Sequence, residues 1–320
     1  MIGQYTLFEW LLFFYTYSFL GWIFESVYVS IQKRRWVNRG FLKGPFLPIY
    51  GGGAVMMLFV SYPFKDNLIL TFFAGAFGAT LLELVTGMLL EAIFKVRYWD
   101  YSNQKFNYKG HICLSSTIAW GFFTIGMNKL LHPEIISIFS VLPDQPVRIV
   151  MALVTCYFLC DIIVSVQEAL DLRNLLVGME DMRKEMLLMR RRVDVIIACV
   201  DDSFREFVES HPGLEHMEEI YKSVEKRYNQ IRQSLPAIEQ IPMSQKQELK
   251  ELKEKFRQVK EKRLLLQRKG GRSLKGRILG NPSMVSRHYK LSLETLKEWV
   301  KEEQAQGKNR KNDVNKTSEM

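Results

Sequence analysis

The sequence lacks most of the residue patterns that catalytic and metal sites require. Its four cysteines, Cys113, Cys156, Cys160 and Cys199, form no CxxC pair and have no histidine at metal-ligand spacing. The GxxxxGK(S/T), HExxH and GxSxG motifs are missing, as is a paired-aspartate signature of an intramembrane protease. We therefore expect reduced cysteines, no metal or cofactor, no enzyme activity and no ATP bound in the P-loop manner.

The first apolar run also lacks the marks of a signal peptide. No Lys or Arg precedes it, and no small-residue cleavage site follows before the next charged loop. The run from Leu7 to Ile31 is longer than the apolar region of a signal peptide. We expect it to be retained as a membrane helix.

Charged residues are scarce in the first half of the chain and abundant in the second, a contrast that the mean hydropathy of −0.06 hides. Residues 171–320 contain 32 Lys and Arg against 24 Asp and Glu, a difference of +8 out of a net +10. This predicts a transmembrane bundle over residues 1–170 and a cytoplasmic region over 171–320. A basic region beside a membrane is attracted to anionic lipid, so we expect lipid contact and no nucleic acid.

Five segments are apolar over about the 20 residues that a membrane-spanning helix needs. They are residues 7–31, 46–62, 67–94, 112–131 and 147–168. The second is the weakest, because Pro45, Pro48 and Gly51 to Gly53 interrupt it. Its backbone needs neighbouring helices, which predicts a segment inside the bundle or a partly re-entrant one.

The charges of the connecting loops predict the orientation. The loops after the first and third spans carry clusters of Lys and Arg, and the other two are neutral or acidic. Basic loops stay in the cytoplasm, which places the N-terminus outside and the C-terminal region inside. If the second span is re-entrant, the loop charges no longer predict this orientation, because the first two loops then lie on the same side of the membrane.

The spans contain an internal repeat of two spans. Three features recur in the same order in both copies. The first copy has Gly21 to Glu25, Asn38-Arg39-Gly40 and Tyr50-Gly51. The second copy has Gly87 to Glu91, Asn107 to Gly110 and Trp120-Gly121. A unit of two spans keeps both copies parallel, as in some transporters. The fifth span stands outside the repeat.

Four carboxylates fall inside the predicted spans: Glu25, Glu83, Glu91 and Asp161. A buried carboxylate is costly, so each needs a partner, a proton or water. One hypothesis is a polar substrate pathway at the repeat interface lined by these residues, with Glu83 the deepest. The alternative is that they pair with Arg34, Arg39, Arg97 or Lys109 and anchor the loops.

The segment 97–110 is dense in aromatic and amide side chains. It is typical of an aromatic belt at the membrane interface, and it also fits a hydrogen-bonded turn that folds back toward the bundle. The residues assigned to this interfacial turn are Arg39, Trp99, Asp100, Asn103 and Asn107.

The tail is predicted to be helical. Its apolar seam follows an a/d heptad pattern from Leu172 to Phe207, with members Leu172, Leu175, Met179, Met182, Met186, Met189, Val193, Ile196, Val200 and Phe207. This pattern predicts a coiled coil, formed either as an intramolecular helix bundle or as a homo-oligomer through residues 172–207. Helices over 214–235, 244–268 and 292–303, a basic Gly-rich loop over 268–277 and disorder over 304–320 complete the prediction.

Two long motifs resemble those of a known family. They are Ser18 to Glu25 with Val37 to Gly51, and Leu82 to Glu91 with Tyr98 to Ser102 and Phe106-Asn107. They resemble the putative ABC-transporter permease family, type IV group, of Gram-positive bacteria, over roughly residues 5–170. The resemblance implies a polytopic protein of the bacterial cell (inner) membrane and carries over no functional residue.

Together these features predict an all-α protein, a bundle of about five membrane helices with a helical coiled-coil tail. We expect a permease subunit that needs a separate ATP-binding subunit, because the chain has no P-loop. The rival hypothesis is a membrane scaffold or sensor that recruits cytoplasmic partners through its tail. The sequence does not indicate a substrate or a direction of transport.

Overall fold

The structure, a computed structural model, describes residues 5–198, 226, 243–302 and 304. The prediction of an all-α fold is confirmed, since strands occur only as the short pair β1 (Asn107–Tyr108) and β2 (Ile112–Cys113) among these residues. Contacts divide the chain into two units. The membrane unit comprises Met1–Leu170 and Gly276–Val285, and the tail unit comprises Asp171–Lys275 and Ser286–Met320.

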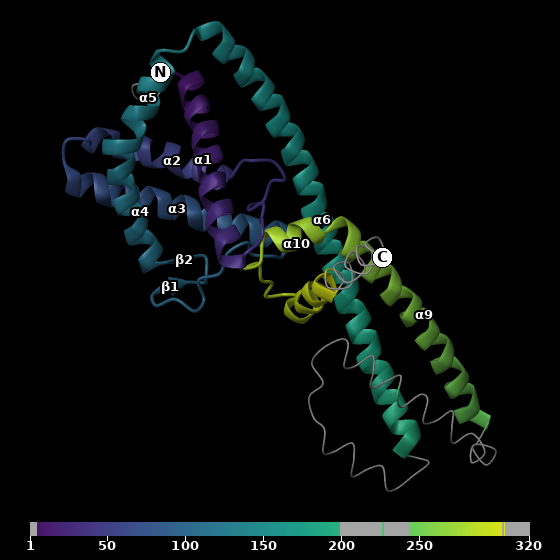
Figure 1. Cartoon of the computed structure of the whole chain (residues 1–320). Helices are drawn as coiled ribbons and strands as arrows, with labels where there is room; N and C mark the ends of the chain where they lie inside the picture. Colours follow the sequence, from purple (N-terminus) through teal and green to yellow (C-terminus); the bar gives the residue numbers. More distant parts are fainter. Residues whose placement is uncertain (1–4, 199–225, 227–242, 303, 305–320) are drawn as a thin grey trace, which may run out of the picture. The chain divides into compact units, whose positions relative to one another are not determined.

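The membrane unit is built mainly from helices, with its longest connections over residues 34–47 and 95–113 (Figure 1). The helices are α1 (Leu7–Lys33), α2 (Pro48–Ser61), the 3-10 helix η1 (Tyr62–Phe64), α3 (Leu68–Phe94), α4 (Leu114–Gly126), the π-helix η2 (Met127–Leu131), α5 (His132–Ser140) and the first part of α6 (Asp144–Ala198).

Local sequence signals explain where the helices begin. Thr6 and Glu9 form a capping box at the start of α1, in which each side chain accepts the other's backbone N–H. Pro48 occupies the first turn of α2, where no helical N–H bond is lost. The Asn67 side chain accepts the N–H groups of Ile69 and Leu70 at 3.1 Å each and caps α3.

Three helices of the described chain are long and apolar enough to cross a membrane. They are Leu7–Lys33, Leu68–Phe94 and the Asp144–Met189 part of α6. The second and fourth predicted spans correspond to shorter helices, because α2 has 14 residues and α4 has 13. Helix α4 continues without a break into η2 and α5. The number of five spans therefore stays a prediction.

The two copies of the repeat share their local geometry. The helices α1 and α3 both end at a basic residue in the left-handed conformation, Arg34 with φ 51° and Lys95 with φ 58°. The two repeat glycines lie where helices touch. A Cβ on Gly51 would lie 2.1 Å from Ser18 Oγ of α1, and one on Gly121 would lie 2.4 Å from the Phe72 ring of α3. Each copy thus packs its two helices together through the same glycine.

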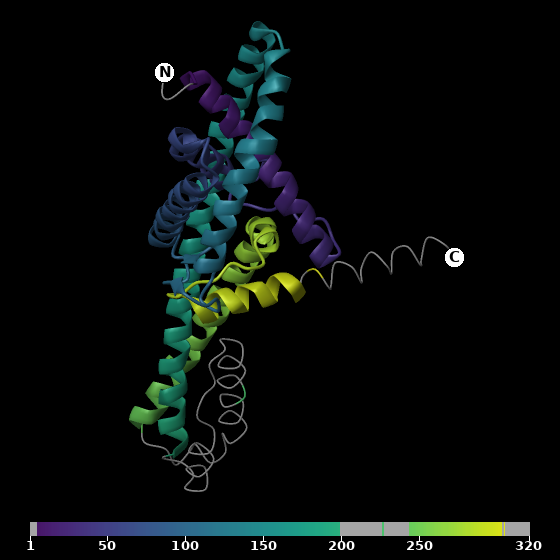
Figure 2. The same ribbon diagram turned by 90° about the vertical axis from the view of Figure 1, so that its left-hand side faces the viewer.

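The tail unit contains the rest of α6, α9 (Met243–Ser273) and a helix over residues 290–302 (Figures 1 and 2). The predicted seam is buried from Leu172 to Met189. Its neighbours come from the same chain, because Glu185 of α6 pairs with Lys262 of α9 at 3.3 Å and Glu180 accepts from Ser292 at 3.2 Å. The seam side chains from Val193 onward, and the predicted helix 214–235, lie outside the described residues.

The prediction of a basic loop over 268–277 is wrong. Helix α9 runs to Ser273, and α10 (Lys275–Gly280) follows at once. Two glycines in a helix cost about 1 kcal/mol each relative to alanine, which tertiary contacts can offset. The residues of α10 from Gly276 onward belong to the membrane unit.

Candidate functional site

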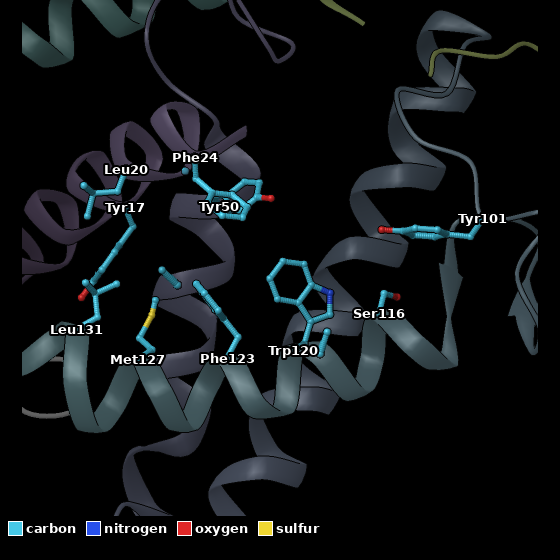
Figure 3. A pocket seen from close by; sticks show the side chains of 13 residues that line it. Tyr17, Leu20, Phe24, Tyr50, Tyr101, Ser116, Trp120, Phe123, Met127 and Leu131 are labelled. Carbon is cyan, nitrogen blue, oxygen red and sulfur yellow. The ribbon is translucent and has the colours of Figure 1, made fainter. Parts of the chain in front are cut away.

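The membrane unit contains a cavity of about 480 Å³. Its walls come from α1, α2, the loop before β1, α4 and η2 (Figure 3). The lining residues are Tyr17, Leu20, Gly21, Phe24, Tyr50, Ala54, Tyr101, Ser116, Ala119, Trp120, Phe123, Met127 and Leu131. In Figure 3 the side chains of α4 face those of α1, and Tyr101 reaches in at the Ser116 end.

Glu83 of α3 lies directly behind this end of the cavity and is 5% exposed. Trp120 donates its indole N–H to Glu83 Oε2 at 3.0 Å, and Tyr101 donates its hydroxyl to Oε1 at 2.9 Å. The Ser116 hydroxyl lies 3.5 Å from Oε2. In the part of the chain that the structure describes, no Lys or Arg lies within ion-pair distance of Glu83. Three lining residues therefore connect the carboxylate to the cavity, although Glu83 itself is not part of its lining.

Tyr101 is held at this position by the loop that carries it. Its backbone N–H donates to the Gly110 carbonyl at 2.9 Å, and the β1–β2 pairing brings the chain back to α4. Burial, and then the neighbouring Glu83 carboxylate, raise the pKa of the Tyr101 hydroxyl. The hydroxyl therefore keeps its proton and remains a donor to Glu83.

Glu25 lies behind a second aromatic residue of the cavity. Tyr50 donates its hydroxyl to Glu25 Oε1 at 2.7 Å, and Arg39 Nε lies 3.7 Å from Oε2. The rings of Tyr50 and Trp120, which are equivalent in the repeat, have centroids 6.4 Å apart. Each copy thus contributes one aromatic side chain that contacts a carboxylate and lines the cavity.

Like Glu25 and Glu83, the other two predicted pathway carboxylates lie outside the cavity lining, and they hold loops. Glu91 Oε2 lies 2.8 Å from Arg97 Nε and 3.0 Å from His111 Nε2. Asp161 is buried and accepts the backbone N–H groups of Lys43 at 3.1 Å and Gly44 at 2.9 Å. The Glu91–Arg97 pair is one that the loop-anchoring alternative names, whereas Asp161 holds its loop through backbone N–H groups.

The predicted interfacial turn is ordered by its own polar groups. Trp99 donates its indole N–H to the His111 carbonyl at 2.9 Å, and Asp100 accepts the Ser102 hydroxyl at 2.6 Å. Asn107 donates to the Gln104 carbonyl at 2.8 Å, while Asn103 is exposed. Arg39 belongs to a different contact, made with the far end of the sequence.

That contact is made by residues 276–285, which we call the docking segment. Arg39 donates to Asn281 Oδ1 at 3.3 Å and to Ser283 Oγ at 3.0 Å. Val285 and Arg97 form an antiparallel bridge, with N–H to carbonyl distances of 2.8 and 3.0 Å. The docking segment therefore binds a basic loop residue from each copy of the repeat.

Arg277 holds the other end of the docking segment and was not singled out from the sequence. Its side chain is 3% exposed and donates to the carbonyl of Ser165 at 2.6 Å and to the Tyr98 hydroxyl at 2.9 Å. Burial raises the pKa of Tyr98, which keeps that hydroxyl neutral beside the guanidinium. The sequence gives no periodic signal for this site, because its partners lie more than 100 residues away.

At the end of the cavity opposite Glu83, Tyr17 connects to a buried histidine. The Tyr17 hydroxyl lies 2.8 Å from His132 Nδ1, and Tyr5 lies 3.0 Å from His132 Nε2. Among the described residues, no group of three or more His, Cys, Asp or Glu side chains is placed to hold a metal ion. The polar groups of the lining are hydroxyl and indole groups, and behind them lie the carboxylates of Glu25 and Glu83 and the imidazole of His132.

One protein-family model matches the first half of the chain. The family is described as "Putative ABC-transporter type IV", and the match covers residues 12–166. These residues include every side chain that lines the cavity, together with all four predicted carboxylates. The docking segment lies beyond the match. No curated protein and no solved structure matches the chain.

Proposed function

Residues 12–166 match the model of the family described as "Putative ABC-transporter type IV", and on this premise we propose that the protein is the permease subunit of a transporter. The cavity beside Glu83 is its substrate pathway. One observation carries this proposal: a buried carboxylate without a basic partner among the described residues stands directly behind a cavity in the membrane unit. An ionisable residue at membrane depth is expensive, which favours a functional role for it.

Energy for transport comes from a separate subunit. The chain has no P-loop, so a partner that binds ATP must supply hydrolysis. The protein lies in the bacterial cell (inner) membrane with its N-terminus outside and its basic tail in the cytoplasm, where that partner is present. The chain itself binds and releases its substrate without changing it.

The rival function is a membrane scaffold or sensor. It is favoured by the docking segment, because residues from the second half of the sequence complete the membrane unit. A tail that is connected to the membrane unit in this way can report its state to cytoplasmic partners. The packed helices of the tail unit would then be the partner surface.

Affinity purification of the full chain from its native membrane distinguishes the two functions. Transport requires that a protein with a P-loop is recovered with the chain in a fixed ratio. Recovery of other proteins without an ATP-binding protein would contradict it and favour the scaffold.

The pathway is tested with Glu83→Gln, which keeps the shape and removes the charge. We expect normal insertion but failure to restore the phenotype of a deletion strain. Glu134→Gln, on an exposed residue of α5, is the matched control and should restore it. Full activity of Glu83→Gln would rule out the pathway.

A further inference from the structure

The cavity of the membrane unit is open along one side. Its walls are α1 and α4, and α2 contributes Tyr50 and Ala54 between them. Four apolar lining residues remain exposed, with Leu20 and Leu131 at 38%, Phe123 at 46% and Phe24 at 64%. The helix α1 is one of the candidate membrane spans. At that depth an apolar opening faces acyl chains, so a ligand enters it from the lipid phase.

The Tyr17 hydroxyl meets His132 at one end of the cavity, and at the other end Tyr50, Tyr101 and Trp120 direct their protons away from the cavity (Figure 3). Tyr50 donates to Glu25 at 2.7 Å, Tyr101 donates to Glu83 at 2.9 Å, and Trp120 donates to Glu83 at 3.0 Å. A phenol has one proton, so each tyrosine oxygen is left only with capacity to accept. The ligand group that fits this end is therefore a hydrogen-bond donor.

The electrostatics of this end favour a positive donor. The lining contains no Lys or Arg. Arg39 accompanies Glu25, whereas Glu83 has only neutral donors among the described residues. Tyr50 and Trp120 also present aromatic rings with centroids 6.4 Å apart, and a cation is attracted to such faces. An ammonium group can donate to the free tyrosine oxygens. Its charge is also attracted to the Glu83 carboxylate behind the cavity and to the aromatic rings.

The rest of the cavity suits an apolar chain. From Ser116 to Leu131 the lining side of α4 and η2 extends about 22 Å at 1.5 Å per residue. Beyond Trp120 this side carries Phe123, Met127 and Leu131, and Leu20 faces them from α1. Apart from the Tyr17 hydroxyl, which is occupied by His132, the cavity is therefore polar at one end and apolar along its length, as an amphiphile is.

We propose that the cavity binds a lipid-like amphiphile with an ammonium head group, taken from the membrane. The head group lies against Tyr50 and Tyr101, and the apolar chain lies between α1 and α4. The inference rests on the proposed function of this cavity as the substrate pathway and names its substrate class.

The test uses the full chain purified in dodecyl maltoside and photoreactive probes that differ only in the head group. Dodecylamine, dodecanol and dodecanoate, each with a diazirine in the chain, are cross-linked and mapped by peptide mass spectrometry. We expect dodecylamine to label peptides of α1 and α4 at a concentration at least tenfold lower than the other two. Butylamine should not compete, because it lacks the apolar chain; equal competition would indicate a soluble amine as the ligand and overturn the proposal.

Variants connect the preference to the site. Glu83→Gln should abolish the preference for the amine, while Glu134→Gln keeps it. Tyr101→Phe, which removes one acceptor oxygen and keeps the ring, should weaken amine labelling even where Glu83→Gln gives little folded protein. Equal labelling by the three probes, labelling outside the cavity, or an unchanged preference in both cavity variants would overturn the proposal.

These outcomes are separable from those of the transport proposal, because binding needs neither nucleotide nor partner. Equal labelling of the unaltered chain by the three probes, alongside a Glu83-dependent phenotype, would refute the ligand class alone. Amine binding without a Glu83-dependent phenotype would refute transport alone.

Discussion

Replacing Arg277 by methionine should release the docking segment from the membrane unit. The buried guanidinium donates to three oxygens, the carbonyls of Phe41 and Ser165 and the Tyr98 hydroxyl, at 3.2, 2.6 and 2.9 Å. It also lies 3.6 Å from Glu168 Oε2 and stacks on the Phe41 ring at 5.0 Å. Methionine fills part of the space but donates nothing.

The size of the loss follows from these contacts. Removing one partner of a buried ion pair costs about 3–5 kcal/mol, because the remaining groups are left without a partner. Glu168 keeps Lys43 at 2.5 Å, so the lower end of this range applies. A loss of about 3 kcal/mol multiplies the population of the undocked segment roughly a hundredfold.

Hydrogen exchange of the backbone amides measures this population. The amides of Val285 and Arg97 are protected by their mutual bridge, so both should exchange about a hundredfold faster in Arg277→Met. Amides in the middle of α3 should not change. Arg277→Lys keeps the charge and should lose less protection, and Arg191→Met, on an exposed arginine of α6, should lose none. Unchanged protection of both bridge amides in Arg277→Met would refute the docking role.

Three further predictions rest on other contacts. Gly280→Ala should weaken docking by about 1–3 kcal/mol in the same exchange assay, because the new Cβ would lie 2.6 Å from the Asn38 carbonyl oxygen. Gly276→Ala, whose Cβ meets nothing within 4 Å, is its control, and equal exchange in the two variants would contradict the close approach at Gly280. Met186→Lys should lower the thermal unfolding midpoint of the tail unit, because Met186 is 1% exposed and an unpaired buried charge costs about 3 kcal/mol or more. Leu188→Lys, at a side chain that is 60% exposed, should leave this midpoint unchanged. Single cysteines at Lys65 and Glu134 should react with a membrane-impermeant maleimide in intact cells while one at Lys105 does not; labelling at Lys105 would reverse the proposed orientation.

Much of the helical fold could be predicted from the sequence, because its signals are local. The apolar runs over Leu7 to Ile31 and residues 67–94 located α1 and α3, and the heptads of the tail located a seam that is buried from Leu172 to Met189. The limits of α2 and α4 were less well predicted. The extent of α9 was missed, because Gly270 and Gly271 suggested a loop.

The sequence predicts the candidate site only through the energetic cost of burying a charge, and that cost is judged for each carboxylate separately. Depth within its span singled out Glu83, and the repeat singled out Glu25 and Glu91. The same rule could not separate carboxylates that anchor loops from one that stands behind a cavity. That difference depends on whether Arg39, Arg97 or Trp120 is the neighbour.

The sequence by itself determined the membrane helices, the repeat and the basic tail, because hydropathy, periodicity and charge act within a few residues of the chain. Only the tertiary structure decided that Trp120 and Tyr101 bind Glu83, and that residues 276–285 return to the membrane unit. These contacts join residues from 18 to more than 200 positions apart. Such contacts form because buried donors and acceptors must find partners wherever the fold brings them together, and no local pattern in the sequence records which partner that will be.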